Sequence, residues 1–225
     1  MTSAREENLD RFSNLNLSKN DINFLVYHYL IQDLRYAIAK YAKGDVFDIG
    51  CGNKPYAELF LSNVNSYKGC DVVQSSKNCV DVICEATNIP VGSSSFDTVI
   101  STQTIEHVAD HRMLVAEAYR LLKPGGYFIV SGPMYWPLHE EPYDYFRFTK
   151  HGFKYVLNGA GFEVTEILSN GGKWALLGQA ILITLPNWMI KPKLVRRLIN
   201  SFFMFVDKKN YDEVSTMNYV IVAKK

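Results

Sequence analysis

Hydrophobic positions recur along this chain with two different periods, and the change from one to the other predicts its elements. Over residues 21–43 the apolar side chains recur at helical spacing, which predicts a long helix that begins at Asn20 and ends at Gly44. Two later stretches have the same period and their own capping residues: 110–122 with Asp110, and 149–160 with Thr149 and Gly161.

Short runs of β-branched and aromatic residues predict the strands. Between residues 45 and 131 they alternate with helical stretches in the order strand, helix, strand, strand, strand, helix, strand. Two further runs, at 162–168 and 217–223, add a sixth and a seventh strand. This alternation implies a mostly parallel sheet with right-handed crossovers, in which ligands bind at the carboxyl ends of the strands.

The most informative run covers residues 46–56 and reads VFDIGCGNKPY. A strand leads into Asp48 and then into Gly50 and Gly52. Pro55 follows, a residue that favours the start of a helix. The glycines allow a tight turn and let a ligand approach the backbone closely. Such a loop predicts a site for a nucleotide-like cofactor.

Two positions decide which cofactor suits this loop. A dinucleotide fingerprint has a glycine at the sixth position, where this chain has Pro55. The carboxylate of Asp48 would also repel a pyrophosphate, by on the order of a few kcal/mol in a partly dry site. The same carboxylate suits a cation, and S-adenosylmethionine carries both an ammonium and a sulfonium. The loop therefore favours S-adenosylmethionine over a nicotinamide dinucleotide.

The loop and four later segments resemble, in their order and spacing, the motifs of class I S-adenosylmethionine-dependent methyltransferases. The loop is similar to D/E-x-G-x-G-x-G, with Lys54 in place of the last glycine. The later segments lie within residues 66–126 and read SYKGCDV, DVICEATNIP, SFDTVISTQTIEHV and LLKPGG. A further run, H-x-x-P-x-D-Y-x-R-F-T followed by AGFEV, is similar to a subgroup of these enzymes associated with bacterial surface-polysaccharide biosynthesis.

The resemblance implies the fold and its divisions. We expect an α/β fold of the Rossmann-like type. It would have a seven-stranded, mostly parallel sheet with helices on both faces, an antiparallel last strand and a helical insertion before it. Residues 1–20 would form a flexible arm and residues 21–225 a single methyltransferase domain, with the helical cap or insertion at about 171–215.

The resemblance also assigns residues to the cofactor. The glycine loop would contact the methionine end of S-adenosylmethionine, the acid at the end of the second strand its ribose hydroxyls, and the third-strand segment its adenine. The acids and the threonine of this set fall at the carboxyl ends of separate strands, so we expect them to converge. The assigned residues are Asp48, Gly50, Cys51, Gly52, Asp71, Val72, Glu85, Ala86 and Thr102.

The methyl acceptor would lie against the segment that follows the fifth strand. A hydroxyl acceptor needs a base, and His139 is the first candidate, unless it is a loop histidine with a structural hydrogen bond. His107 is the second candidate and otherwise supports the site. Tyr143, Asp144 and Arg147 are expected to bind the substrate. Arg147 would either clamp a phosphate or carboxylate or pair with Asp144.

Residues 174–206 are unusually apolar and leave two interpretations open. The stretch Trp174–Ile190 is too short and too interrupted for a membrane span, which needs about 20 apolar residues. A basic segment and then Phe202–Val206 follow, which suits an interfacial membrane anchor. The other interpretation is a helical cap packed on the sheet edge or on a second copy of the chain in a homodimer.

The composition of the chain limits the classes of partner and metal that we expect it to bind. The chain has 225 residues and a formal net charge of +1, which argues against a nucleic-acid-binding surface built from bulk charge. Its four cysteines have no zinc-ribbon spacing, so we expect reduced thiols in a cytoplasmic protein and no metal site. Docking through residues 174–206 would place the protein at the inner face of the membrane.

The leading functional hypothesis is S-adenosylmethionine-dependent O-methylation of a sugar hydroxyl, on a glycan or on its activated precursor. The alternative is a quinone or lipid methyltransferase that docks on a membrane. Two less favoured hypotheses are a nicotinamide oxidoreductase and a protein that holds the cofactor without turnover.

Overall fold

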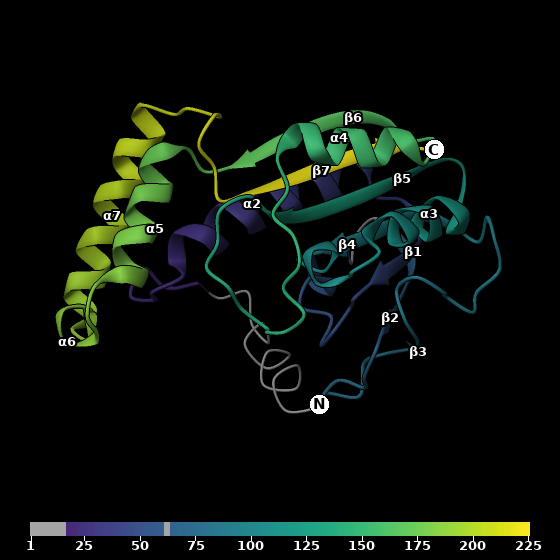
Figure 1. Ribbon diagram of the computed structural model, residues 1–225, viewed down its shortest axis with the longest axis horizontal. Helices are drawn as coiled ribbons and strands as arrows, with labels where there is room; N and C mark the ends of the chain where they lie inside the picture. Colours follow the sequence, from purple (N-terminus) through teal and green to yellow (C-terminus); the bar gives the residue numbers. More distant parts are fainter. Residues whose placement is uncertain (1–16, 61–63) are drawn as a thin grey trace.

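One seven-stranded sheet forms the centre of the computed structural model, which describes residues 17–60 and 64–225 (Figure 1). The strand order is β3-β2-β1-β4-β5-β7-β6, and β7 runs antiparallel to both of its neighbours. Most of the arm expected over residues 1–20 lies outside the described residues. The strands are β1 (Gly44–Ile49), β2 (Val64–Asp71), β3 (Val82–Ile83), β4 (Phe96–Thr102), β5 (Leu122–Pro133), β6 (Glu163–Asn170) and β7 (Asn218–Lys224).

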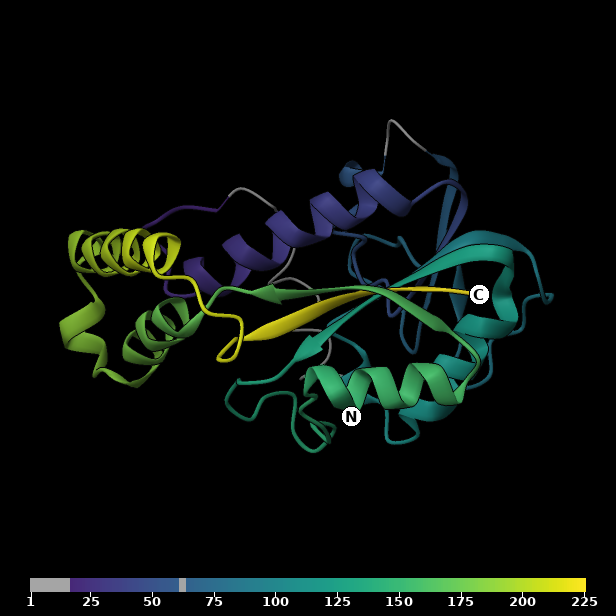
Figure 2. The same ribbon diagram turned by 90° about the horizontal axis from the view of Figure 1, so that it is seen from above.

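Helices cover both faces of this sheet (Figure 2). Helix α2 (Phe24–Tyr41) lies on one face, where its apolar stripe packs on inward side chains of β1, β4, β5 and β7. Helices α3 (His111–Leu121) and α4 (Lys150–Gly159) lie on the other face and complete the larger core. The Rossmann-like α/β fold expected from the alternating pattern is therefore confirmed, including the antiparallel last strand.

The helix ends depend on local hydrogen bonds, and here two predictions were wrong. Helix α2 begins after Asn23, not at Asn20, and its last residue is followed by Ala42 in an extended conformation. Gly44 does not end the helix but opens β1 with φ +60°. A Cβ at this position would clash with the side chain of Asp97, so the position requires glycine.

The other predicted caps are confirmed. The side chain of Asp110 accepts a hydrogen bond from the Met113 amide at the start of α3. The hydroxyl of Thr149 accepts one from the Gly152 amide at the start of α4. Gly161, which follows α4, has φ +96°, a conformation that a side chain rarely adopts.

The glycine loop after β1 leads into a shorter element than its proline suggests. Among the described residues between Pro55 and β2, the helical element is a single 3₁₀ turn, η1 (Ala57–Leu59). A second 3₁₀ turn, η2 (Ile105–His107), follows β4. Because β1 and β4 are neighbours while their connections leave in opposite directions, the loops after them border one crevice.

The chain between β6 and β7 forms the helical insertion that the sequence predicts. It contains α5 (Lys173–Thr184), the short α6 (Asn187–Ile190) and α7 (Lys193–Lys209). Figures 1 and 2 show these helices as a hairpin that projects beyond one end of the sheet. The hairpin packs on the first turn of α2 and on Met217, which precedes β7. None of the helices in the described residues is long and apolar enough to span a membrane.

Candidate active site

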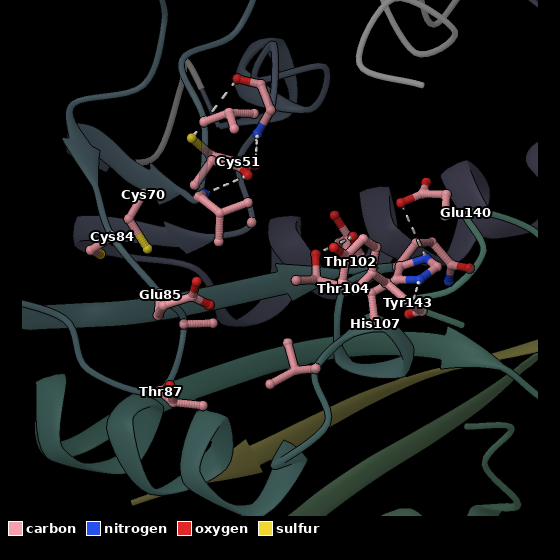
Figure 3. A pocket seen from close by; sticks show the side chains of 18 of the residues that line it. Cys51, Cys70, Cys84, Glu85, Thr87, Thr102, Thr104, His107, Glu140 and Tyr143 are labelled. Atoms are coloured by element: carbon pink, nitrogen blue, oxygen red, sulfur yellow. Dashed lines mark hydrogen bonds and ion pairs between the residues drawn. The ribbon is translucent and has the colours of Figure 1, made fainter. Parts of the chain in front are cut away.

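A cavity of about 580 Å³ lies at the carboxyl ends of β1, β2 and β4. Figure 3 shows Cys51, Cys70 and Glu85 on one side of it and His107 and Tyr143 on the other. Ten of the residues predicted for the site line it: Gly50, Cys51, Gly52, Asp71, Val72, Glu85, Ala86, Thr102, His107 and Tyr143.

The glycine loop forms one wall of the cavity. Gly50 and Gly52 have φ values of +80° and +48°, in the left-handed region that favours glycine. A Cβ on Gly50 would lie 2.3 Å from Oγ1 of Thr104, so a side chain at this position would displace the cavity wall. The Gly52 amide donates a hydrogen bond to Oδ2 of Asp71 at 3.0 Å, which ties the loop to the end of β2.

Lys54 stands where the resembled motif has its last glycine, and it keeps the glycine-like backbone. Its φ is +52°. Its ammonium pairs with Asp81 and lies 5.7 Å from the ring centroid of Tyr67. These contacts hold the side chain outside the cavity, so the substitution leaves the loop in place.

Asp48 lies under the loop and not on the cavity wall. It is 1% exposed, and its Oδ2 accepts a hydrogen bond from the Tyr67 hydroxyl. Its Oδ1 accepts no hydrogen bond from the described residues. Burial raises the pKa of Asp48 to about 7, and the charge of Asp71 adds to the rise, while Tyr67 and Lys54 oppose it. A buried acceptor without a donor fits a cofactor that brings an ammonium group.

The three thiols at the cofactor side are packing groups. Cys51 and Cys70 are buried, and burial raises the pKa of both well above that of a free thiol. The pKa of Cys84 is also raised, again mainly by burial. A raised pKa keeps these thiols protonated at neutral pH, so they are poor nucleophiles.

The opposite wall of the cavity comes from η2 and from the loop over residues 134–149. His107 Nδ1 lies 3.0 Å from the backbone oxygen of Tyr143. The rings of His107 and His139 meet edge to face, with centroids 4.7 Å apart. The backbone oxygen of Glu106 accepts hydrogen bonds from the amides of Tyr145 and Phe146, which ties the loop to η2.

His139 lies behind His107, outside the cavity lining. Both its backbone amide, at 2.9 Å, and its Nδ1, at 3.2 Å, face Oδ2 of Asp144. Burial lowers the pKa of His139, and the neighbouring His107 lowers it further, while Asp144 opposes the change. The imidazole is therefore held in one orientation by a carboxylate.

Arg147 holds Asp144 and not a ligand. Its guanidinium donates hydrogen bonds to both carboxylate oxygens of Asp144, at 2.6 and 2.7 Å. Its remaining donors bond to backbone oxygens of Trp136, Phe146 and Pro137. Burial alone would raise the pKa of Asp144, but the bonds from Arg147 and the His139 amide outweigh it and lower that pKa to about 2. Of the two roles considered for Arg147, the structure has the pairing with Asp144, and neither residue lines the cavity.

Glu106 is the residue that the sequence analysis did not single out. It is fully buried, and neither carboxylate oxygen accepts a hydrogen bond of ordinary geometry within the part of the chain described. Burial raises its pKa to about 8, opposed by its own backbone amide and by the charge of Arg147. Its place beside His107 in the TIEHV segment was the available signal.

The comparisons with known proteins match the segment of the chain that contains the glycine loop. Residues 47–130 match the family described as "Methyltransferase domain". A probable S-adenosylmethionine-dependent methyltransferase of Mycolicibacterium smegmatis is 31% identical over 139 residues, which cover 57% of this chain and 51% of that protein. A tRNA (carboxymethyluridine(34)-5-O)-methyltransferase of Macaca fascicularis is 37% identical over 108 residues, which cover 43% of this chain and 15% of that protein.

Solved structures share the fold. The [4+2]-cyclase SpnF has a TM-score of 0.60 at 17% identity and covers 90% of this chain and 82% of its own. The methyltransferase in a complex with the Haloferax volcanii Trm112 activator has a TM-score of 0.60 at 16% identity and covers 96% of both chains. The chain thus spans about half the length of its Mycolicibacterium relative and a small part of the tRNA-modifying relative.

Proposed function

We propose that this protein is an S-adenosylmethionine-dependent methyltransferase that transfers the methyl group to a sugar hydroxyl, on a glycan or on its activated precursor; the match of residues 47–130 to the family described as "Methyltransferase domain" supports the proposal. The observation that carries the proposal is the division of the cavity. A glycine loop with two acids lines one side, and a histidine with polar neighbours lines the other. The first half suits a cationic adenosyl donor and the second half suits a hydroxyl acceptor.

The cofactor half is proposed to work by holding the donor still. Gly50 to Gly52 would face its methionine end, with the buried Asp48 compensating the ammonium charge. Asp71 would bind the ribose hydroxyls, and Glu85 with Ala86 would border the adenine. Methyl transfer is an in-line displacement, so positioning the acceptor within about 3–3.5 Å of the methyl carbon supplies most of the acceleration.

On the acceptor side, His107 is proposed as the base. It lines the cavity, whereas His139, the first candidate from the sequence, lies behind it. The Tyr143 carbonyl oxygen beside Nδ1 of His107 requires a proton on that nitrogen, so Nε2 is the atom that would take the proton of the acceptor. His139 and the pair of Asp144 with Arg147 would position it.

A binding and transfer experiment tests both halves of the proposal. Calorimetry with S-adenosylhomocysteine measures the cofactor half. Transfer of a labelled methyl group is then followed with nucleoside diphosphate sugars, a hydroquinone and a tRNA as acceptors. Label on the sugar supports the proposal, and label on either other acceptor alone contradicts it. His107→Gln should lower turnover at unchanged S-adenosylhomocysteine affinity, with His151→Gln on α4 as the control.

The surface of α7 favours a second candidate, a lipid or quinone acceptor reached at a membrane. Four apolar side chains spaced along one face of α7 are each more than half exposed, and they form the α7 stripe: Leu194, Leu198, Phe202 and Phe205. Lys193 and Arg197 at one end and Lys208 and Lys209 at the other end flank it. An apolar stripe between cationic ends matches an anionic bilayer surface.

Flotation with vesicles separates these candidates. Binding to vesicles that contain anionic lipid, and not to neutral ones, supports the membrane surface as the partner of the α7 stripe. A concentration-dependent dimer that Leu198→Glu breaks, without vesicle binding, contradicts it and favours the second copy of the chain.

A further inference from the structure

The wall of the cavity that η2 and the 134–149 loop form is here called the acceptor wall. Two pairs of adjacent residues face each other there. Glu106 and His107 come from η2, and His139 and Glu140 come from the loop after β5. Glu106, His107 and His139 each offer one ligand atom, and these three atoms lie within 4.8 Å of one another. The carboxylate of Glu140 lies 3.8 Å from Nε2 of His107. Two segments far apart in the sequence thus bring carboxylates and imidazoles to one point.

Both imidazoles are oriented in the way that metal-binding histidines are. Nδ1 of His107 lies 3.0 Å from a backbone oxygen, and Nδ1 of His139 lies 3.2 Å from the Asp144 carboxylate. Since these oxygens can only accept, a proton on each Nδ1 satisfies them, and in the neutral imidazole Nε2 then keeps its lone pair. Such an oxygen acceptor behind the ring fixes the tautomer and raises the basicity of the ligating nitrogen.

Glu106 supplies an independent indication of a ligand. It is buried, and neither oxygen accepts a hydrogen bond from the residues that the structure describes. The nearest cationic candidate is Nε2 of His107 at 3.9 Å. Arg147 does not hydrogen-bond to it, because its donors are engaged by Asp144 and by backbone oxygens. A buried carboxyl group in this state either keeps its proton or is compensated by a cation, and a bound metal ion would supply that charge.

The backbone at Glu140 is also unusual. Its φ of +53° lies in the left-handed region, where residues other than glycine are uncommon. Strained residues of this kind cluster at functional sites because the surrounding structure must hold them there. Here the conformation belongs to a carboxylate that lines the cavity next to His107.

We propose that Glu106, His107 and His139 bind one divalent cation at the acceptor wall. Two imidazoles and one carboxylate form a donor set for first-row transition metals such as Mn²⁺, Co²⁺ or Zn²⁺, whereas Mg²⁺ and Ca²⁺ prefer oxygen ligands alone. Bonds of about 2.1 Å bring ligand atoms to roughly 3 Å from one another, so the 134–149 loop closes slightly when the metal binds.

The role of the cation rests on the proposed function. It would bind the acceptor hydroxyl and lower its pKa. In the metal-bound protein the imidazoles are ligands, so the Glu140 carboxylate replaces His107 as the base and takes the hydroxyl proton; His107 is the base only without the metal. The oxygen then attacks the methyl carbon, the carbon–sulfur bond breaks, and its electron pair goes to the sulfur, which becomes a neutral thioether.

Metal binding is measured first on the chain without cofactor. After dialysis against a chelator, calorimetry with MnCl₂, CoCl₂, ZnCl₂ and MgCl₂ should show one equivalent of a transition metal bound and Mg²⁺ at least tenfold weaker. Bound Co²⁺ should have the visible spectrum of nitrogen and oxygen ligation. Glu106→Gln and His139→Gln should each weaken binding at least tenfold, while the exposed controls Glu163→Gln and His151→Gln leave it unchanged.

Binding of S-adenosylhomocysteine to the same variants tests whether they are folded. Intact cofactor affinity in Glu106→Gln and His139→Gln shows that they fold, so their lost metal binding supports the site. No binding of any of the metals at millimolar concentration overturns the site while the methyltransferase proposal stands. Metal binding that survives both substitutions also overturns it. Metal binding without S-adenosylhomocysteine binding keeps the site and overturns the proposed function.

Discussion

The sheet and the helical insertion place polar and apolar side chains in opposite ways. Around the sheet, apolar residues fill both layers between strands and helices, and the polar groups gather at the carboxyl edge. In the insertion, α7 buries Asn200 and Asp207 and exposes the α7 stripe. One part of the molecule has an ordinary core with a site at its edge, and in the other part α7 combines buried polar residues with exposed apolar ones.

The buried polar side chains of α7 hydrogen-bond to backbone groups of neighbouring segments. The Asp207 carboxylate accepts the amides of Gly172 and Ala175, which are the unpaired donors at the start of α5. The Asn200 amide donates to the backbone oxygens of Lys19 and Asp21. The insertion is thus assembled by hydrogen bonds from α7, which leaves the apolar side of this helix for another surface. The difference between the two regions fits our proposal that the sheet half performs the chemistry and the insertion contacts a partner surface.

The largest effect is expected from breaking the insertion at its polar centre. Asp207→Ala leaves two buried amides without acceptors and should lower the free energy of unfolding by about 2–4 kcal/mol. Denaturant unfolding measures it, with Glu163→Gln as the control. S-adenosylhomocysteine affinity in the folded variant should be unchanged, and a parallel loss of affinity would contradict the division into two regions.

The cofactor half is probed next by Asp71→Ala. The variant loses the carboxylate that we assign to the ribose hydroxyls, and S-adenosylhomocysteine binding should weaken by about 1–3 kcal/mol. Calorimetry measures the change. Asp71→Asn, which keeps one acceptor for the Gly52 amide, should lose less. An unchanged Kd in the alanine variant rules out this assignment.

A smaller effect should appear in the pH dependence of stability through Asp48. Its pKa in the fold is about 7, above its ordinary value of 3.8, so the fold prefers the protonated acid. The stability contribution of this acid is complete below pH 3.8 and is lost as the pH rises through 7. Relative to Asp48→Asn, the parent chain should therefore lose on the order of 1 kcal/mol or more between pH 4 and 8. If the unfolding temperatures of the two proteins change with pH in the same way, the pKa of Asp48 is not raised in the fold, and the prediction is wrong.

The smallest effect on stability should come from the α7 stripe. Leu198→Glu with Phe202→Glu changes exposed side chains only, so the free energy of unfolding should shift by no more than about 0.5 kcal/mol. Binding to anionic vesicles should nevertheless fall strongly. Tyr155→Glu, at an exposed aromatic position on α4, serves as the control. A large loss of stability in the double variant would mean that this face is covered within the chain itself.

The predictable parts of this molecule are those that depend on neighbours in sequence. The strand and helix order and the caps at Asp110 and Thr149 follow from local patterns, and the structure has them. The start of α2 was misplaced, because Asn20 forms a local turn with Ser18 instead of a cap. Gly44 was misread because its conformation depends on Asp97, more than 50 residues away.

In the site, too, the features that depend on residues distant in sequence could not be predicted. The loop glycines and Asp71 lie on the cavity wall because the motif itself encodes the strand end. The engagement of Arg147 with Asp144 was one of two readings, and the choice required the backbone oxygens around it. The buried state of Glu106 could not be predicted, since it depends on the 134–149 loop closing over η2. The inverted polarity of α7 likewise depends on partners at Lys19 and Gly172.

The 134–149 loop is fastened at two distant places. Near one end, Trp136 packs in the small core between α2 and the hairpin, and further along, the loop amides hold η2. His139 lies between these fastenings. The position of the His139 imidazole therefore depends on the hairpin, through Trp136, as well as on η2.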